Sequence, residues 1–237
     1  MEYKRAIELD PDNLDAHNNL GIVYVAMERI NDAAVEFETA TQLDPKVANV
    51  HNNLGIVHAK QGNHDRAIHE LNKAVSLGFD NADVHNNLAG VYLTQGSTDR
   101  AITELKLALT CNPEDYNAHT NLGNAYLSKG RGDEAISEFT EAIKYNPADG
   151  EIHYYLGNAL YRKGHYAAAA DAFCQSVYYQ PDNPLAHKML GIMYANYLNN
   201  FSGALFHLGE TLRLDPQQSM AKELNEIIDK LRKQSNQ

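Results

Sequence analysis

Histidine is the most regularly spaced chemically active residue in this chain of 237 residues. Six histidines recur at a constant interval of 34 residues: His17, His51, His85, His119, His153 and His187. Imidazole is a common metal ligand, but packed helices lie about 8–10 Å apart, whereas zinc holds its ligands at about 2.0–2.1 Å. Histidines of successive repeats therefore cannot share one ion, and the spacing indicates packing residues. We expect no metal site and no cofactor.

Asparagine follows two residues after each of the first four histidines. We call these four residues, Asn19, Asn53, Asn87 and Asn121, the asparagine ladder. A side-chain amide both donates and accepts hydrogen bonds, so it can pair with a peptide group in a bidentate manner. The ladder therefore predicts binding of an extended backbone with little regard to its side chains. Tyr155 and Met189 occupy the same position in the last two repeats, so the ladder covers four repeats.

The elements that position these residues follow the same 34-residue period. A leucine lies three residues after each histidine, at positions 20, 54, 88, 122, 156 and 190, and a glycine or alanine follows it. A second stripe begins with alanine at positions 33, 67, 101, 135, 169 and 204, with phenylalanine or leucine four residues later. Spacings of three and four place such residues on one face of a helix. The two stripes therefore predict two helices in each repeat, and we expect Gly62, Gly96, Gly130 and Gly164 at the turns between them.

This pattern, closed by proline at positions 45, 113, 147, 181 and 216, resembles the tetratricopeptide repeat. The family usually has tryptophan early in the first helix, and histidine stands in its place here. The resemblance implies an all-α solenoid of helix-turn-helix repeats that forms a right-handed superhelix. We expect the repeats at 14–47, 48–81, 82–115, 116–149, 150–183 and 184–218, the last with one inserted residue between Asn196 and Phe201.

The two ends of the chain differ from the repeats. Residues 1–13 match the second half of a truncated repeat, which suggests a fragment of a longer protein. The apolar face left open there could bring two copies together as a homo-oligomer. The pattern of residues 219–237 predicts a helix with an apolar stripe on one side and charged residues on the other. Such a helix would cap the last repeat, because a solenoid needs a terminal element with a polar outer face to stay soluble.

The first helix of each repeat lines the concave groove in the family that this chain resembles. Besides the ladder, the groove face is expected to present the polar residues Asn52, Asn86, Asn124 and Asn158. Near the C-terminal end it is expected to present an aromatic and basic patch of Tyr154, Tyr155, Tyr161, Arg162 and Lys188. Tyrosine and arginine are favoured anchors at interfaces, so this patch suits an acidic or aromatic anchor of a partner.

These features predict a protein-protein interaction scaffold or adaptor that binds an extended peptide or partner segment in its groove. The ladder is also similar to the asparagine ladder in the superhelical domain of O-linked N-acetylglucosamine transferases. That likeness implies an alternative, a substrate-targeting module of a larger enzyme. A third alternative is a self-associating homo-oligomeric scaffold. We expect no enzyme activity, because no nucleophile elbow, phosphate loop or HExxH motif is present.

Composition and charge exclude other classes of partner. The formal net charge of −11 disfavours nucleic acid, whose binding depends on neutralised phosphates. No apolar run approaches the ~20 residues that span a bilayer, so membrane insertion is not expected. No segment is typical of a signal peptide, which favours a cytoplasmic location.

Two further sets of residues are expected to be structural. Cys111 aligns with Leu43 and Leu77, which predicts a core position, whereas Cys174 falls where exposure is possible. Glutamates recur at one position of the second helix, at positions 36, 70, 104 and 138. We interpret them as a solvated face rather than as catalytic acids.

Overall fold

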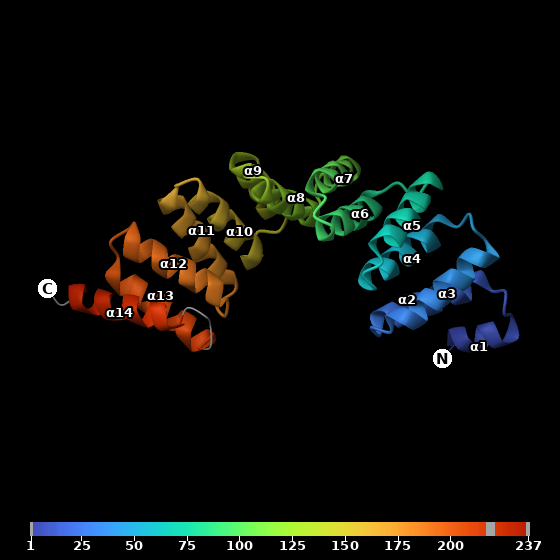
Figure 1. The fold of residues 1–237 in the computed structure, drawn as a ribbon, viewed down its shortest axis with the longest axis horizontal. Coiled ribbons are helices and arrows are strands. Elements are labelled where there is room, and N and C mark those ends of the chain that lie inside the picture. The colour runs from blue at the N-terminus through green and yellow to red at the C-terminus, as the bar shows by residue number, and fades with distance from the viewer. Residues whose placement is uncertain (1, 217–220, 236–237) are drawn as a thin grey trace. The chain divides into compact units, whose positions relative to one another are not determined.

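The computed structural model describes residues 2–216 and 221–235, and every regular element in these ranges is an α-helix (Figure 1). The chain divides into two compact units, residues 1–118 and 119–237. Unit 1 contains α1 (Glu2–Leu9), α2 (Leu14–Ala26), α3 (Ile30–Leu43), α4 (Ala48–Lys60), α5 (His64–Ser76), α6 (Ala82–Thr94) and α7 (Thr98–Cys111). The boundary falls within α8 (Tyr116–Ser128). Unit 2 continues with α9 (Gly132–Tyr145), α10 (Gly150–Arg162), α11 (Tyr166–Tyr179), α12 (Pro184–Asn196), α13 (Phe201–Leu214) and α14 (Ala221–Ser235). The predicted all-α fold is confirmed.

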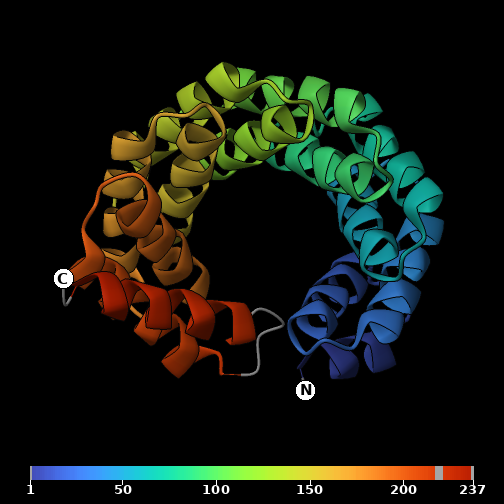
Figure 2. The same ribbon diagram turned by 60° about the vertical axis from the view of Figure 1, so that its left-hand side comes forward.

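The helices pack in pairs, which we call hairpins, and the hairpins stack in chain order within each unit (Figure 2). The pairs are α2–α3, α4–α5 and α6–α7 in unit 1, and α10–α11 and α12–α13 in unit 2. We call the first helix of a hairpin its A helix and the second its B helix. None of the described helices combines the length and the apolar character needed to cross a membrane.

Local sequence signals set the ends of these helices. The side chain of Asn13 accepts a hydrogen bond from the backbone N–H of Ala16 and so caps α2. After α4, Gly62 adopts a φ of +78°, and the N–H of Asn63 donates to the carbonyl of His58 at 2.9 Å. Only glycine adopts this left-handed backbone without strain. All four glycines predicted at turns have positive φ, so that prediction is confirmed.

Small residues on the A helices let the paired B helices approach closely. A Cβ atom added to Gly21 would lie 2.6 Å from the ring of Phe37, which is itself only 1% exposed. The same relationship recurs between Gly157 and Phe173, where the distance would be 2.7 Å. Both hairpins therefore bury one large side chain of the B helix against the backbone of the A helix.

The C-terminal elements are a longer turn and a final helix. The turn between α12 and α13 spans residues 197–200, one residue longer than the turn between α10 and α11. The apolar stripe of α14 packs on α13 through Leu224, Ile228 and Leu231, which are 1–6% exposed. Residues 219, 220, 236 and 237 of the predicted capping helix lie outside the described residues.

Candidate functional site

The asparagine ladder in unit 1 lies on A helices that are neighbours in space, since α4 contacts both α2 and α6. Nδ2 of Asn53 donates to Oδ1 of Asn18 at 3.0 Å, and Nδ2 of Asn87 donates to Oδ1 of Asn52 at 3.2 Å. Asn53 and Asn87 are thereby each held by the amide that precedes the ladder residue of the previous repeat. Among the described residues, Oδ1 of Asn53 and of Asn87 accepts no hydrogen bond, so both remain available to a ligand.

The predicted groove residue Asn52 anchors the ladder instead of facing solvent. Asn18 and Asn52 are only 8% and 7% exposed. Asn86, the third residue of this row, donates from Nδ2 to Oδ2 of Asp115 at 2.7 Å. Oδ1 of Asn86 is buried and has no partner among the described residues. Sequence reasoning missed this anchoring role, although the Asn-Asn doublet in three repeats is the signal for it.

Two hollows lie between the A helices of unit 1, each beside a ladder residue. The hollow between α2 and α4 has a volume of about 110 Å³ and is lined by Ile22, Val25, Phe37, Asn53 and Ile56. The hollow between α4 and α6 has a volume of about 220 Å³, and its lining includes Ile56, Ala59, Asn87, Gly90 and Thr94. Ile56 lines both hollows. One amide and one largely apolar hollow therefore recur at the interval of one repeat.

The predicted site residues of unit 2 lie on α8, α10 and α12. Asn121 is exposed, whereas Asn124 and Asn158 are half-buried. Arg162, at the end of α10, is exposed and forms no ion pair with any described residue. Lys188 lies on α12 and is half-buried.

The predicted aromatic and basic patch of unit 2 contains two groups of tyrosines. In the first, the ring of Tyr154 lies 5.9 Å from the rings of Tyr155 and Phe173. In the second, Tyr161 lies 5.9 Å from Tyr166 and 6.3 Å from Tyr197. No ring contact joins the two groups among the described residues.

The first group offers a neutral hydroxyl held in place by its neighbours. Tyr155 stacks at 5.8 Å on Phe139, and its hydroxyl donates to a carboxylate oxygen of Glu151 at 2.5 Å. Burial, together with that carboxylate, raises the pKa of Tyr155 to about 12. The side chain therefore stays protonated at neutral pH and presents an aromatic surface of fixed orientation.

The histidines are packing residues, as predicted, but each of the first four also bonds a carboxylate. Nδ1 of His17 lies 2.6 Å from Oε2 of Glu36, and Nε2 lies 2.9 Å from the carbonyl oxygen of Pro11. The same histidine–glutamate pair recurs with Glu70, Glu104 and Glu138 at 2.6–2.7 Å. These carboxylates are only 17–21% exposed. The interpretation of the glutamates as a solvated face was therefore wrong, because that face of the B helix turns toward the histidine.

The prediction that Cys111 fills the core was also wrong. Cys111 is exposed because it is the last residue of α7, where the helix leaves the core. Cys174 is half-buried, and its Sγ lies 3.3 Å from the hydroxyl of Tyr194.

Comparison with known proteins decides the family. A tetratricopeptide repeat model matches residues 54–116 and 120–186, and a second TPR model matches residues 2–28 and 23–62. The chain belongs to the tetratricopeptide repeat family. No curated protein matches the sequence. The further likeness to O-linked N-acetylglucosamine transferases stays a prediction.

Solved structures of other TPR proteins share the fold. Pseudomonas aeruginosa pilF is 24% identical with a TM-score of 0.78, and the match covers 90% of this chain and 96% of pilF. YrrB, described as a TPR protein with an unusual peptide-binding site, is 22% identical with a TM-score of 0.65, covering 78% of this chain and 96% of YrrB. The APC/C hetero-tetramer Cut9–Hcn1 contains a chain that is 21% identical with a TM-score of 0.73, covering 97% of this TPR protein and 44% of that chain. These similarities confirm the helical repeat solenoid.

Proposed function

We propose that this TPR protein is a scaffold that binds an extended segment of a partner protein along the A helices of unit 1. The observation that carries the proposal is the repetition of one arrangement, a ladder amide with a free acceptor beside a largely apolar hollow. A single amide or hollow would be ordinary surface. Two such pairs of amide and hollow, one repeat apart, match an extended peptide, whose backbone groups and side chains also recur at a regular interval.

The chemistry of the two parts is complementary. Asn53 and Asn87 each offer a free carbonyl oxygen to an N–H of the ligand backbone, and their anchored position lowers the entropy lost on binding. The hollows beside Ile22 and Ile56 would take aliphatic side chains. Neighbouring A helices lie about 8–10 Å apart, and an extended chain advances about 3.3 Å per residue. About three ligand residues therefore span the distance from one hollow to the next.

The residues of unit 2 extend the same proposal to a second contact. Asn121, Asn124 and Asn158 provide further amides for a backbone, and the tyrosines with Arg162 and Lys188 provide an aromatic and cationic surface for an acidic or aromatic side chain. The printed description of YrrB as a peptide-binding TPR protein supports a peptide ligand for this fold.

The proposal is tested with a displayed library of random 12-residue peptides, selected on the purified chain. Selected peptides are labelled, and their dissociation constants are measured by fluorescence anisotropy. The double variant Asn53→Ala/Asn87→Ala is expected to weaken binding at least tenfold, since two bonds to the backbone are lost. Ile56→Glu, which places a charge at both hollows, is expected to abolish binding.

Asn72→Ala is the matched control, because Asn72 is an exposed asparagine on the B helix α5. Replacing backbone amides of the peptide by N-methyl amides should weaken binding to the wild type but not weaken it further for the ladder variant. Selected peptides that bind both variants as tightly as the wild type would contradict the proposal. Measuring mass against concentration tests the alternative of a self-associating scaffold.

A further inference from the structure

The third histidine of the series has surroundings that its counterparts lack. Nε2 of His51, His153 and His187 lies 2.9–3.0 Å from the carbonyl oxygen of the proline six residues earlier. Phe79 replaces that proline before His85, after a glycine with a φ of +97°. Nε2 of His85 instead lies 2.8 Å from Oδ1 of Asp80. A carboxylate therefore replaces a carbonyl at this one position.

The residue at the end of the B helix also differs here. At the ends of α9 and α11, that residue is a tyrosine whose ring stacks on the histidine of its own repeat: Tyr145 on His119 at 6.0 Å, and Tyr179 on His153 at 5.5 Å. In the α6–α7 hairpin the corresponding residue is Cys111. The stacking position thus brings a thiol, instead of a ring, to the edge of His85.

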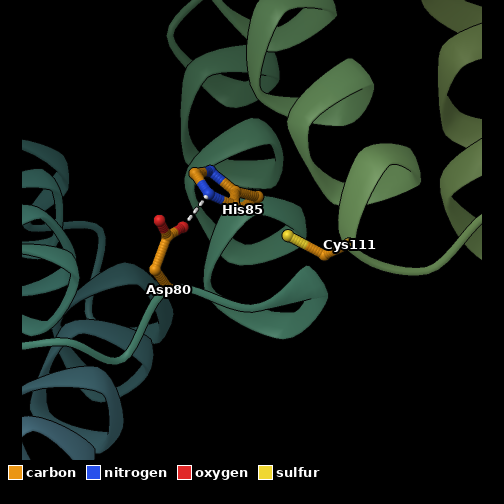
Figure 3. Close-up of side chains that lie close together, drawn as sticks. All are labelled: Asp80, His85 and Cys111. Atoms are coloured by element: carbon orange, nitrogen blue, oxygen red, sulfur yellow. Dashed lines mark hydrogen bonds and ion pairs between the residues drawn. The ribbon is translucent and has the colours of Figure 1, made fainter.

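These two departures from the repeat meet at one place. One ligand atom each from Asp80, His85 and Cys111 lies within 4.8 Å of the other two. The carboxylate and the sulfur both point toward the imidazole (Figure 3). All three residues belong to unit 1 and come from the turn before α6, from α6 and from the end of α7.

We propose that Asp80, His85 and Cys111 form a binding site for a divalent transition metal, with Zn²⁺ as the preferred ion. Thiolate, imidazole and carboxylate are the three ligand types that zinc takes in proteins. Magnesium and calcium prefer oxygen ligands alone, so a site with sulfur and nitrogen selects against them. On binding, the thiol of Cys111 and the Nε2–H of His85, which now bonds the Asp80 carboxylate, each release a proton to solvent, and the sulfur and Nε2 bond the ion.

The geometry needs only small movements. Tetrahedral zinc with bonds of about 2.0–2.3 Å separates its ligand atoms by about 3.3–3.7 Å. Asp80 and His85 would move apart by about 0.5 Å from their present hydrogen bond. The side chain of Asp80 is 62% exposed and Cys111 lies at a helix end, so both can adjust.

The site also has the outer-shell partner expected of a metal-binding histidine. Nδ1 of His85 lies 2.7 Å from Oε2 of Glu104, a hydrogen bond that fixes the ring and leaves Nε2, beside Asp80 and Cys111, as the nitrogen that bonds the ion once its proton is released. Three protein ligands leave a fourth tetrahedral position on the exposed side. Water or a donor atom of a bound partner would complete the coordination.

The test uses the full chain, freed of metal by chelation and kept under a phosphine reductant. Co²⁺ is titrated as a spectroscopic substitute for Zn²⁺, because a thiolate ligand gives a charge-transfer band in the near ultraviolet. One equivalent should produce this band in the wild type. Zn²⁺ should abolish it by displacement, and the displacement curve yields the zinc affinity.

Cys111→Ser and Asp80→Asn change exposed residues, so the variants are expected to fold, as circular dichroism will verify. Cys111→Ser should lose the thiolate band, and Asp80→Asn should lower the zinc affinity at least tenfold. Glu104→Gln should lower it about 10–100-fold, the usual effect of an outer-shell partner.

Cys174→Ser is the matched control and should retain the band and the zinc affinity of the wild type. A wild type that gives no thiolate band with Co²⁺ would overturn the proposal. A band that persists in Cys111→Ser and disappears in Cys174→Ser would overturn it as well. So would zinc binding that is equally tight in the wild type and in both ligand variants, since that would place the ion on other histidines.

Discussion

The carboxylate of Glu36 contacts Nδ1 of His17 at 2.6 Å, so the B helix of the first hairpin holds the ring of its A helix. On the other side of the ring, Nε2 lies 2.9 Å from the carbonyl oxygen of Pro11, which lies in the turn between α1 and α2. The histidine thus connects two structural neighbours through a nearly buried pair of contacts. Tryptophan, the usual residue here in the family, could fill the space, but its single ring nitrogen could not bond both neighbours.

The first prediction concerns the equivalent pair His51–Glu70. Glu70→Ala should lower the free energy of unfolding by about 1–2 kcal/mol, because it leaves a nearly buried N–H without its acceptor. Glu70→Gln keeps an acceptor and should cost less. Urea unfolding followed by circular dichroism measures both. Glu38→Ala, at an exposed position of a B helix, is the control and should be close to neutral. Equal effects of Glu70→Ala and Glu38→Ala would show that the pair contributes nothing.

The second prediction concerns the close approach of Gly157 to Phe173. Gly157→Ala should destabilise unit 2 by about 1–3 kcal/mol, since the new methyl would lie 2.7 Å from the ring and the packed core cannot yield. Gly209→Ala is the matched substitution, because Gly209 lies within α13 with no atom within 4 Å of the added Cβ. It should stabilise by about 0.5–1 kcal/mol through helix propensity. Thermal unfolding of the two variants should therefore shift in opposite directions, and shifts of the same sign would be inconsistent with this packing.

The third prediction concerns pH. In the last hairpin, His207 replaces the glutamate, and its Nδ1 lies 2.9 Å from Nδ1 of His187. Burial, together with the neighbouring His187, lowers the pKa of His207 to about 4, despite the opposing carboxylate of Glu210. The unfolded chain binds this proton below its ordinary pKa of about 6.5 and the folded chain does not. Stability should therefore fall as the pH drops from 6.5 to 4, by on the order of 2 kcal/mol.

The variant His207→Gln removes this titration and keeps a donor toward His187. Urea unfolding midpoints measured between pH 7 and 4.5 should then fall less steeply than those of the wild type. His165→Gln, which changes an exposed histidine in the turn before α11, should leave the slope unchanged. A wild-type slope that survives in His207→Gln would assign the acid sensitivity to other groups.

The fourth prediction concerns the terminal helix α14. Ile228→Ala should cost about 2–4 kcal/mol, because the side chain is 6% exposed and packs in the cluster with Leu208 and Leu224. In a repeat protein each element contacts only its neighbours, so the loss should be local. Hydrogen exchange should quicken in α13 and α14, with little change in α2–α7. Lys230→Ala, on the exposed side of the helix, should change neither region.

Several features followed directly from the sequence. The 34-residue period, the buried stripes and the glycine turns could be predicted because helical spacing and backbone preference act over a few residues. Gly62 and the equivalent glycines of later repeats can adopt the positive φ that a turn after a helix requires. Leu54 and Phe37 belong to apolar stripes at helical spacing, and such a stripe faces the core. The inserted residue near Asn196 was predicted from the sequence because the last interval between the stripe alanines is 35 residues instead of 34.

Other features depended on contacts between residues far apart in the chain. Glu36 lies 19 residues from His17, and Asn53 lies 35 residues from Asn18, so neither bond can be read from local spacing. The rotation of each helix about its axis decided that the glutamates face the histidines and that Asn52 is buried. The position of a helix end decided that Cys111 is exposed beside His85 and Asp80. The sequence alone thus determined the repeat and its helices, whereas tertiary packing decided which polar groups meet, because hydrogen bonds and metal ligands depend on differences of an ångström that the pattern of apolar residues does not specify.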